Sequence, residues 1–208
     1  MAKPVRRDPE RTKRNILAAA VVEFTAKGLA GARVDAIARR AKANKRMIYA
    51  YFGNKEALWL AALESVYARM REEERGLSVA QMSPEDGMAA LMRFNFRFCH
   101  EHPEFIALLN SENLHKARYL KQSKRMRELY SPLLAQIDDL LRRGQASGAF
   151  RNGVDATDLY IIIAALGFFP NSNAHTLSTI FERDLKSSAA LRERERQLVD
   201  VVLGYLRR

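Results

Sequence analysis

Basic and aromatic side chains recur at one-turn spacing early in the chain, at Lys45, Arg46 and Tyr49. On a helix, Lys45 would lie one turn before Tyr49, and Arg46 one turn before Ala50. Such a narrow outward face fits the major groove of DNA, where arginine pairs with a guanine edge and a small apolar side chain contacts a thymine methyl group. We therefore predict that Arg46 and Ala50 contact bases.

Other side chains of this stretch are better placed for the DNA backbone. Lys45, Tyr49 and Lys55 are predicted to contact phosphates, and Lys55 also stands at a helix N-terminus, which favours anions. Met47 has two interpretations, contact with a base or filling of a gap in the protein core. Tyr51 either contacts DNA or packs inside the domain. The sequence leaves both alternatives open.

Short helices must hold these side chains. The apolar residues of the preceding segment fall at helical spacing and predict a short amphipathic helix: Val34, Ile37, Ala38 and Ala41. Asn44 can cap a second short helix, because its side-chain oxygen can accept from an orphan amide of the first turn. Asn54 is predicted to cap a third helix, which begins at Lys55. Ile48 and Phe52 lie four apart on another face and are predicted to be core. Two short helices with a tight connection predict a helix-turn-helix that binds DNA.

The same stretch resembles the DNA-binding domain of the tetracycline-repressor-like (TetR) family of bacterial transcriptional regulators. Two patterns carry the resemblance, Val-x-x-Ile-Ala-x-x-Ala and Tyr-x-Tyr-Phe-x-x-Lys-Glu-x-Leu, together with a preceding helix that ends Phe24-x-x-x-Gly28. The residues are Val34, Ile37, Ala38, Ala41, Tyr49, Tyr51, Phe52, Lys55, Glu56 and Leu58. Because three helices match in register over roughly the first 60 residues, the resemblance is specific.

Four residues depart from the usual pattern of the family. Ala32 and Arg33 stand where Thr or Ser usually opens the first short helix, and Arg33 can supply a charged substitute that contacts DNA. Lys42 stands where a turn glycine is common, and Asn44 where serine is common. Asn44 is kept as a candidate DNA-binding residue beside its role as a cap.

The distribution of charge supports a DNA-binding N-terminal part. The 208-residue chain has a net charge of +11. Residues 1–55 contain 14 Lys and Arg against 4 Asp and Glu, a net +10, which leaves +1 for the rest. Neutralisation of phosphates requires such a concentration of positive charge, whereas lysines and arginines that merely solvate surface helices would not be divided so unevenly. We predict a DNA-binding domain at 1–55 and a helical regulatory domain at 56–208.

Composition indicates a globular cytoplasmic protein. Hydrophobic residues make up 48% of the chain, and its one cysteine, Cys99, has no partner for an internal disulfide, so a reducing cytoplasm is expected. The opening MAKPVRRD has no apolar run behind it and does not resemble a signal peptide. The longest apolar run, Leu159 to Phe169, is shorter than the roughly 20 residues of a membrane span. Residues 1–7 form a basic tail that either reaches a minor groove or, more simply, stays solvated.

Helical patterns continue along the rest of the chain, so the predicted fold class is all-α. Capping and breaking residues predict helices from Lys55 to the charged segment before Gly76, from Pro84 to His102, from Pro103 to Leu109, from Ser123 to Ala146 with Pro132 inside it, from Tyr160 after an Asp155 cap to a stop at Pro170, and from Ser188 to Leu206. The tract FFPNSNAHTLSTIF at 168–181 resembles a connection in some TetR-family regulators.

The regulatory part contains aromatic and polar side chains that could line a small-molecule pocket, because such pockets are mostly apolar with a few placed polar groups. The candidates are Phe94, Phe98, Asn110, His115, Tyr160 and Phe168. Each could equally be an ordinary core residue. The resemblance adds that two C-terminal helices from each of two chains commonly form a four-helix dimer interface in this family.

Catalytic and metal-binding patterns are not found. The chain has no glycine-rich phosphate loop, no nucleophile elbow and no zinc spacing. His100 and His102 flank Glu101, but consecutive helical side chains point apart, so ligation of a metal is disfavoured. Cys99 follows Phe98 and is predicted to be a buried small hydrophobe. No cofactor is expected, and the chain is not predicted to be an enzyme.

Taken with the resemblance, these patterns predict a homodimeric, ligand-responsive regulator, most often a repressor in this family. Two helix-turn-helix domains would occupy successive major grooves of a palindromic DNA operator and would be released by a small-molecule effector. Two alternatives remain: a sequence-tolerant DNA-binding protein, which does not need the large near-neutral second part, and a small-molecule-binding enzyme or carrier, which does not need the basic first part.

Overall fold

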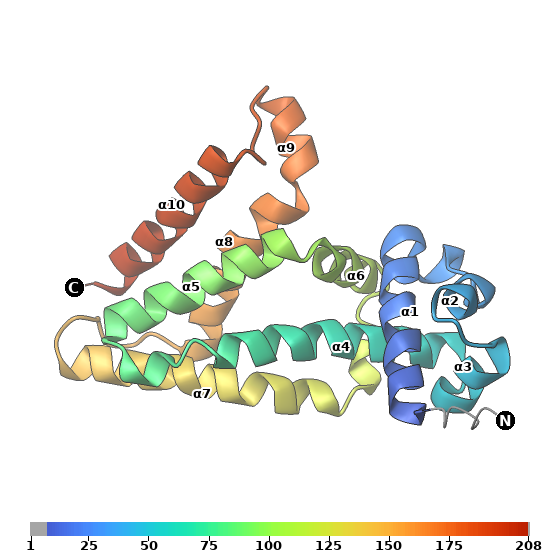
Figure 1. The fold of residues 1–208 in the computed structure, drawn as a ribbon. Helices are drawn as coiled ribbons and strands as arrows, with labels where there is room; N and C mark the ends of the chain where they lie inside the picture. The colour runs from blue at the N-terminus through green and yellow to red at the C-terminus, as the bar shows by residue number, and fades with distance from the viewer. Residues whose placement is uncertain (1–7, 208) are drawn as a thin grey trace, which may run out of the picture. The chain divides into compact units, whose positions relative to one another are not determined.

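The protein is described by a computed structural model over residues 8–207; the basic tail at 1–7, with its predicted minor-groove contact, lies outside the described residues. Over this range the chain consists of helices and their connections, with no β-strand (Figure 1). The predicted all-α fold class is confirmed. None of the helices within residues 8–207 is both long and apolar enough to cross a membrane.

Contacts divide the chain into two compact units. The first contains the chain up to Ala68 together with Ala107–Met126, and the second contains Arg69–Ile106 together with the chain from Arg127 onward. The chain passes between the units within α4 (Lys55–Arg75), within α6 (Pro103–Leu114) and near the start of α7 (Arg125–Ala146). The functional boundary between residues 55 and 56 stays a prediction, and it falls at the start of α4.

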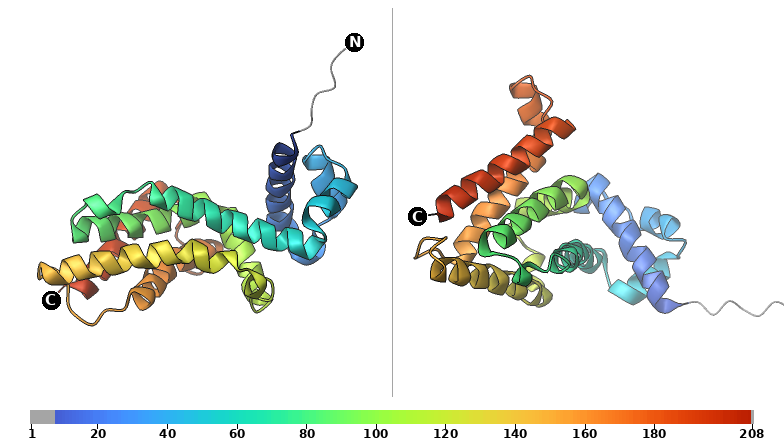
Figure 2. Two further views of the ribbon diagram at one scale, coloured as in Figure 1. Left: turned by 90° about the horizontal axis from the view of Figure 1, so that it is seen from below. Right: turned by 60° about the vertical axis from the view of Figure 1, so that its left-hand side comes forward.

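The first unit begins with three helices that pack on one another: α1 (Pro9–Gly31), α2 (Val34–Arg40) and α3 (Lys45–Phe52) (Figures 1 and 2). Asp8 caps α1 by accepting from the backbone amide of Arg11 at 3.1 Å, as the Asp-Pro start predicts. Gly28 interrupts α1 with φ of 62°, a left-handed conformation that glycine adopts without steric cost. Large apolar side chains from all four N-terminal helices form the core of this unit: Ile16, Phe24, Ile37, Ile48, Leu58 and Trp59.

The second unit is built around α5 (Pro84–Glu101), which packs against α8 (Ala156–Ser172) and α10 (Ser188–Leu206) (Figure 1). Most of α7 completes this core, and α9 (Ala174–Ile180) connects α8 to α10. Short 3₁₀ turns lie at Val79–Gln81 in this unit and at Leu120–Gln122 in the first. The most deeply buried core side chains come from four helices and from the α7–α8 connection: Met88, Met92, Leu140, Phe150, Leu159 and Val202.

Helix starts agree with the predicted caps more closely than helix ends do. Ser83 caps α5 by accepting from the amide of Asp86 at 3.1 Å, and Asp155 caps α8 by accepting from Thr157 and Asp158 at 2.8 and 3.0 Å. Helix α8 therefore begins at Ala156, immediately after the cap, rather than at Tyr160. The bounds of α10 are the predicted ones.

The predicted stop at Pro170 is wrong, because α8 continues two residues further to Ser172. Near a helix end, one lost backbone hydrogen bond interrupts little of the remaining helix, and side-chain amides supply donors there: Asn171 donates to the carbonyl of Gly167 at 2.8 Å and Asn173 to that of Phe169 at 3.0 Å. The tract at 168–181 contains the end of α8 and the short helix α9, which connects α8 to α10. Pro132 lies inside α7, as predicted, and the helix is continuous across it.

Candidate nucleic-acid interface

A tight turn joins α2 to α3 and fixes the direction of α3. Lys42 occupies this turn with φ of 51°, the left-handed conformation for which glycine is better suited. Asn44 then caps α3, because its side-chain oxygen accepts from the amide of Met47 at 2.8 Å, as predicted. Asn54 caps α4 in the same way, accepting from Ala57 at 2.7 Å. Both short helices therefore begin where the sequence predicts.

Helix α3 has one buried side and one exposed side. Ile48 is 1% exposed and belongs to the core, as predicted, whereas Phe52 is only half-buried. The predicted base-contacting residues Arg46 and Ala50 are exposed, and so are Lys45 and Tyr49, the latter at 42%. Met47, Tyr51 and Lys55 are half-buried. The structure thus brings four of the predicted DNA-binding side chains onto one accessible helix.

Two of the candidate cations have interactions within the protein. Lys45 Nζ lies 3.2 Å from Asp35 Oδ1 of α2, and both side chains are about half exposed. Lys55 Nζ donates to the carbonyl of Ala30 at 3.3 Å, which holds its ammonium group at the end of α1. Because an exposed ion pair contributes little free energy, Lys45 can exchange Asp35 for a phosphate at small cost.

Arg33 stands at the N-cap of α2, but its side chain makes no capping hydrogen bond. Instead its backbone amide donates to Glu23 Oε1 at 3.2 Å, so a carboxylate from α1 binds the amide at the start of α2. The guanidinium group of Arg33 remains exposed. Its predicted contact with DNA stays a prediction.

Sequence reasoning did not select three exposed cations next to these helices, namely Arg39, Arg40 and Lys42. Arg40 and Lys42 line an open groove of about 410 Å³ together with residues of α1. The available signal was the basic pair at the end of α2, a position where cations also complement the helix dipole. These side chains extend the positive surface beyond α3.

The six predicted ligand-binding residues do not form a single group. Phe94 and Phe98 lie on α5 with ring centroids 5.8 Å apart and ring planes tilted by 39°, and Tyr160 on α8 donates its hydroxyl hydrogen to the hydroxyl oxygen of Tyr130 at 3.3 Å. Phe168 is half-buried on the same helix. These four lie in the second unit. Asn110 and His115 lie in the first unit, where His115 is exposed. All six assignments stay predictions.

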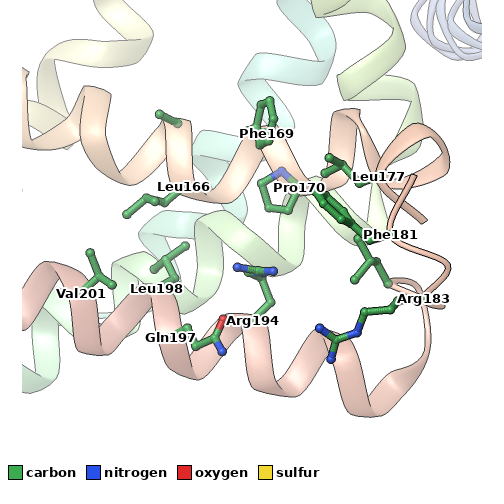
Figure 3. A pocket seen from close by; sticks show the side chains of 12 residues that line it. Leu166, Phe169, Pro170, Leu177, Phe181, Arg183, Arg194, Gln197, Leu198 and Val201 are labelled. Carbon is green, nitrogen blue, oxygen red and sulfur yellow. The ribbon is translucent and has the colours of Figure 1, made fainter. Parts of the chain in front are cut away.

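An open pocket of about 860 Å³ lies between α8, α9 and α10 of the second unit (Figure 3). Apolar side chains line most of it, including Leu166, Phe169, Pro170, Phe181 and Leu198. None of the six predicted ligand-binding residues lines this pocket. Its exposed aromatic rings form a surface suited to a protein partner rather than to solvent.

A buried carboxylate orders the end of α6 in the first unit. Glu112 is 1% exposed and accepts from the indole N–H of Trp59 at 2.9 Å and from the backbone amides of Tyr119 and Leu120 at 2.8 and 2.9 Å. The ring of Trp59 packs edge-on against that of Phe24, with centroids 5.1 Å apart. The side chain of Trp59 on α4 therefore contacts both α1, through Phe24, and α6, through Glu112.

Cys99, His100 and His102 are the side chains that could react or bind a metal ion. Cys99 is buried as predicted, and burial raises the pKa of its thiol to about 12, so it is not a reactive thiolate at neutral pH. His102 Nδ1 lies 3.0 Å from Glu104 Oε1, whereas His100 is exposed. Within residues 8–207 no group of three His, Cys, Asp or Glu side chains is arranged to hold a metal ion.

Two known protein families match the chain over most of its length. Residues 16–62 match the family described as "Bacterial regulatory proteins, tetR family", and residues 84–202 match "Tetracyclin repressor-like, C-terminal domain". The first match contains the whole of α2 and α3, and the second contains α5 to α9 and most of α10.

Individual proteins are similar over comparable lengths. The HTH-type transcriptional repressor NicS of Pseudomonas putida is 38% identical over 199 residues, which are 96% of this chain and 94% of that protein. The HTH-type transcriptional repressor SCO4008 of Streptomyces coelicolor is 35% identical over 77% of this chain and 78% of its own length. A structure from Mesorhizobium loti, described as a TetR-family regulator, is 20% identical, covers 96% of this chain and 98% of its own, and has a TM-score of 0.73.

Proposed function

The chain belongs to the TetR family of bacterial regulatory proteins, and from this premise we propose how it acts as a DNA-binding transcriptional repressor. Two copies of the chain form a homodimer, and the two α3 helices enter successive major grooves of a palindromic operator. A small-molecule effector then favours a conformation in which the two helices no longer match the operator spacing. Two of the relatives, NicS and SCO4008, are named as transcriptional repressors, and no catalytic role is proposed for this chain.

The exposed side of α3 is the observation that carries the proposal. Arg46 and Ala50 are exposed one turn apart, as base contacts require, and Lys45 and Tyr49 flank them on the same short helix. Ile48 anchors the opposite side in the core, so the face cannot turn inward without exposing an apolar side chain. The remaining candidates, Arg33, Asn44, Met47, Tyr51 and Lys55, are assigned to the edges of the same surface.

The apolar surface of α8, α9 and α10 supports the homodimer. Large hydrophobic side chains are exposed on all three helices, namely Ile161, Phe169, Ile180, Phe181 and Val201. An isolated protein rarely exposes so many apolar side chains together, and a second copy would bury them. A dimer also supplies the two-fold symmetry that a palindromic operator needs.

The effector is proposed to bind in the second unit, with Phe94, Phe98, Tyr160 and Phe168 near it. The coupling must be reciprocal, so the operator weakens effector binding by the same factor as the effector weakens operator binding. The proposed place of action is the cytoplasm, where the chromosome of a bacterium lies.

Fluorescence anisotropy with duplexes tiled across the DNA upstream of the protein's own gene tests the proposal. A scrambled duplex of equal length serves as the control, and the titrations are repeated over a salt series. The expected result is a saturable complex on one palindromic segment, with two subunits per site and an affinity well above that for the scramble.

Two outcomes would contradict parts of the proposal. Equal affinity for every duplex, including sites selected from random DNA, with the same steep salt dependence, would indicate a sequence-tolerant DNA-binding protein. If a folded dimer bound no DNA at all, the assignment of α3 as the recognition helix would be wrong.

A further inference from the structure

A buried arginine in the second unit lacks hydrogen-bond acceptors. Arg71, on α4, is only 3% exposed, and none of its three guanidinium nitrogens has a hydrogen-bond partner in the described part of the chain. A guanidinium group stays charged at every physiological pH and carries five N–H donors. Because a buried charge is strongly unfavourable without partners, the arrangement calls for an acceptor that does not come from residues 8–207.

The nearest carboxylate compensates this charge incompletely. Glu74 Oε2 lies 3.0 Å from Arg71 Nη1, in an orientation that forms an ion contact but not a hydrogen bond. Burial raises the pKa of Glu74 to about 7, although Arg71 and Arg75 both act to lower it. Near neutral pH Glu74 is therefore protonated in part of the molecules, and in these its carboxyl group offers no negative charge to Arg71.

One tyrosine ring contacts the guanidinium group, and a second tyrosine is hydrogen-bonded to the first. The central carbon of the guanidinium group lies 5.1 Å from the ring centroid of Tyr130 on α7, and the Tyr130 hydroxyl lies 3.3 Å from that of Tyr160 on α8. Burial raises the pKa of Tyr160, so its hydroxyl stays protonated at neutral pH. Charge, phenolic hydroxyls and aromatic rings thus come together where α4, α7 and α8 meet.

A small cavity adjoins Arg71. Its volume is about 40 Å³, and its lining residues come from α4 and α7: Arg71, Glu74, Arg75, Glu128, Leu129, Pro132, Leu133 and Gln136. A cavity of this size can hold one or two water molecules or a group of similar size. A carboxylate group is such a group, and the flat fork of a guanidinium matches its two oxygens.

We propose that Arg71 binds the carboxylate of a small monoanionic organic acid and that this acid is the effector of the proposed repressor. The inference rests on the proposed function for its regulatory meaning, but the binding itself does not. A phosphate is disfavoured, because Glu128 lines the same cavity as Arg71 and would repel a second negative charge, as Glu74 does whenever it is ionised.

The size of the cavity connects binding to regulation. Pockets for whole small molecules usually measure about 300–1,000 Å³, so the cavity accepts the carboxylate group but not the body of the acid. Binding of the whole acid therefore requires α4 and α7 to separate. Helix α4 is continuous from Lys55, directly after α3, to Arg75, so a displacement around Arg71 acts on the helix that leads to the DNA-binding surface.

Isothermal titration calorimetry on the full chain tests the inference, with benzoate as the probe and benzamide as its uncharged counterpart of the same shape. Sodium chloride is matched throughout, since a chain of net charge +11 attracts anions generally. The variants are Arg71→Met and Arg71→Lys, and the control is Arg69→Met, an exposed arginine two residues earlier on the same helix. Arg71→Met can fold, because an unpaired Glu74 takes up a proton and becomes neutral.

The wild-type protein is expected to bind benzoate and not benzamide. Arg71→Met should weaken benzoate binding by about tenfold or more, Arg71→Lys by less, and Arg69→Met by no more than about twofold. The inference is overturned if benzoate does not bind, if benzamide binds equally, if inorganic phosphate binds more tightly than benzoate, or if Arg69→Met has the same effect as Arg71→Met.

DNA binding measured on the same samples separates the two proposals. Sequence-specific DNA binding without benzoate binding would leave the repressor standing and remove the carboxylate site. Benzoate binding that depends on Arg71, in a protein that binds no DNA, would leave the carboxylate site standing and remove the repressor.

Discussion

Two adjacent side chains on α3 have different roles in the proposed interface, although both are exposed cations. Arg46 has a planar fork that can bind two acceptors on one guanine, whereas Lys45 is a point charge that already pairs with Asp35. A base contact distinguishes sequences, and a phosphate contact does not. The difference can be measured once an operator is known.

We expect Arg46→Ala to lower the preference for the operator over a mutated operator by about 1–3 kcal/mol, because a base contact is lost. Lys45→Ala should weaken binding to both duplexes equally and reduce the slope of log K against log salt by about one. Anisotropy titrations on the two duplexes at several salt concentrations measure both quantities. If the two variants behaved alike, the division into base and phosphate contacts would be wrong.

The turn before α3 contains a residue in an unfavourable conformation. Lys42 has φ of 51° and its side chain is exposed, so no buried contact of that side chain offsets the strain. The position therefore retains a stability deficit that a single substitution can remove.

Lys42→Gly is expected to raise the free energy of unfolding by roughly 0.5–1 kcal/mol, because glycine adopts positive φ without strain. Lys42→Ala is the matched control, since it removes the same charge but keeps the strain. Urea denaturation followed by circular dichroism measures both. Equal stability of the Gly and Ala variants would show that the conformation of this turn carries no cost.

At the scale of helices, the sequence predicts starts well because a start depends on local chemistry. Asn44, Asn54, Ser83 and Asp155 each accept a hydrogen bond from an amide within three residues, and each was recognised from residue type and position alone. Helix α9 was missed because it is short and contains polar residues that also favour turns.

In the candidate site too, the features set by local sequence could be predicted, and those set by contacts between distant residues could not. The exposed face of α3 could be predicted, since it depends on spacing within eight residues. Arg71 and Glu74 were not selected, because in the sequence they belong to a charged run that reads as a solvated surface. Their burial depends on side chains far along the chain, such as Tyr130 of α7, whose ring centroid lies 5.1 Å from the Arg71 guanidinium carbon.

Close packing between α7 and the connection that follows it depends on one glycine. A side chain at Gly144 would overlap the ring of Phe150, which is fully buried, while the Gly144 carbonyl accepts from the Phe150 amide at 3.0 Å. Ring and backbone are therefore both fixed, and neither can move away without disturbing the core.

Gly144→Ala is expected to lower the free energy of unfolding by about 1–3 kcal/mol, because it overpacks this contact. Gly31→Ala is the control, since a methyl group there meets only Lys27 Cβ, at 3.5 Å. Thermal denaturation of both variants provides the comparison. A Gly144 variant as stable as the control would mean that Phe150 and the α7–α8 connection move to accommodate the added methyl group without loss of stability.

At the scale of the whole molecule, the proposed dimer predicts that one surface substitution separates the subunits. Phe169 is 57% exposed on α8, and replacing it with glutamate would place a charge in the proposed interface. We expect Phe169→Glu to be monomeric at micromolar concentration and to lose cooperative operator binding. Analytical ultracentrifugation measures the mass.

Leu114→Glu is the control for this experiment, because Leu114 is an 84% exposed leucine on α6 that is not among the residues assigned to the dimer. This variant should remain dimeric. A dimeric Phe169→Glu, or a monomeric Leu114→Glu, would place the interface elsewhere.

The titration of Glu74 makes the stability of the protein depend on pH. Burial raises the pKa of Glu74 in the folded protein to about 7, above its ordinary value of 4.5, so between these values the folded state binds more protons than the unfolded state. This contribution to stability is fully present below about pH 4.5 and is lost as the pH rises to about 7. Its upper limit is about 3 kcal/mol.

Glu74→Gln removes this titration, so the difference in unfolding free energy between wild type and variant should change with pH in that window. The wild type should lose stability relative to Glu74→Gln between pH 5 and pH 7 and remain at a constant difference above about pH 8. Urea denaturation across this range measures the difference. A difference independent of pH would show that Glu74 titrates normally in the folded protein.

The bond between Trp59 and Glu112 gives the protein an optical probe of its own. Trp59 is the only tryptophan of the chain, so the long-wavelength fluorescence of the native protein comes from one indole. That indole is fully buried, packed against Phe24 and bonded to a carboxylate on α6. Any motion that separates α6 from α4 would expose the indole to water or break its bond and would shift its emission. Conformational change on binding DNA or an organic acid can therefore be followed in the unlabelled protein, in real time.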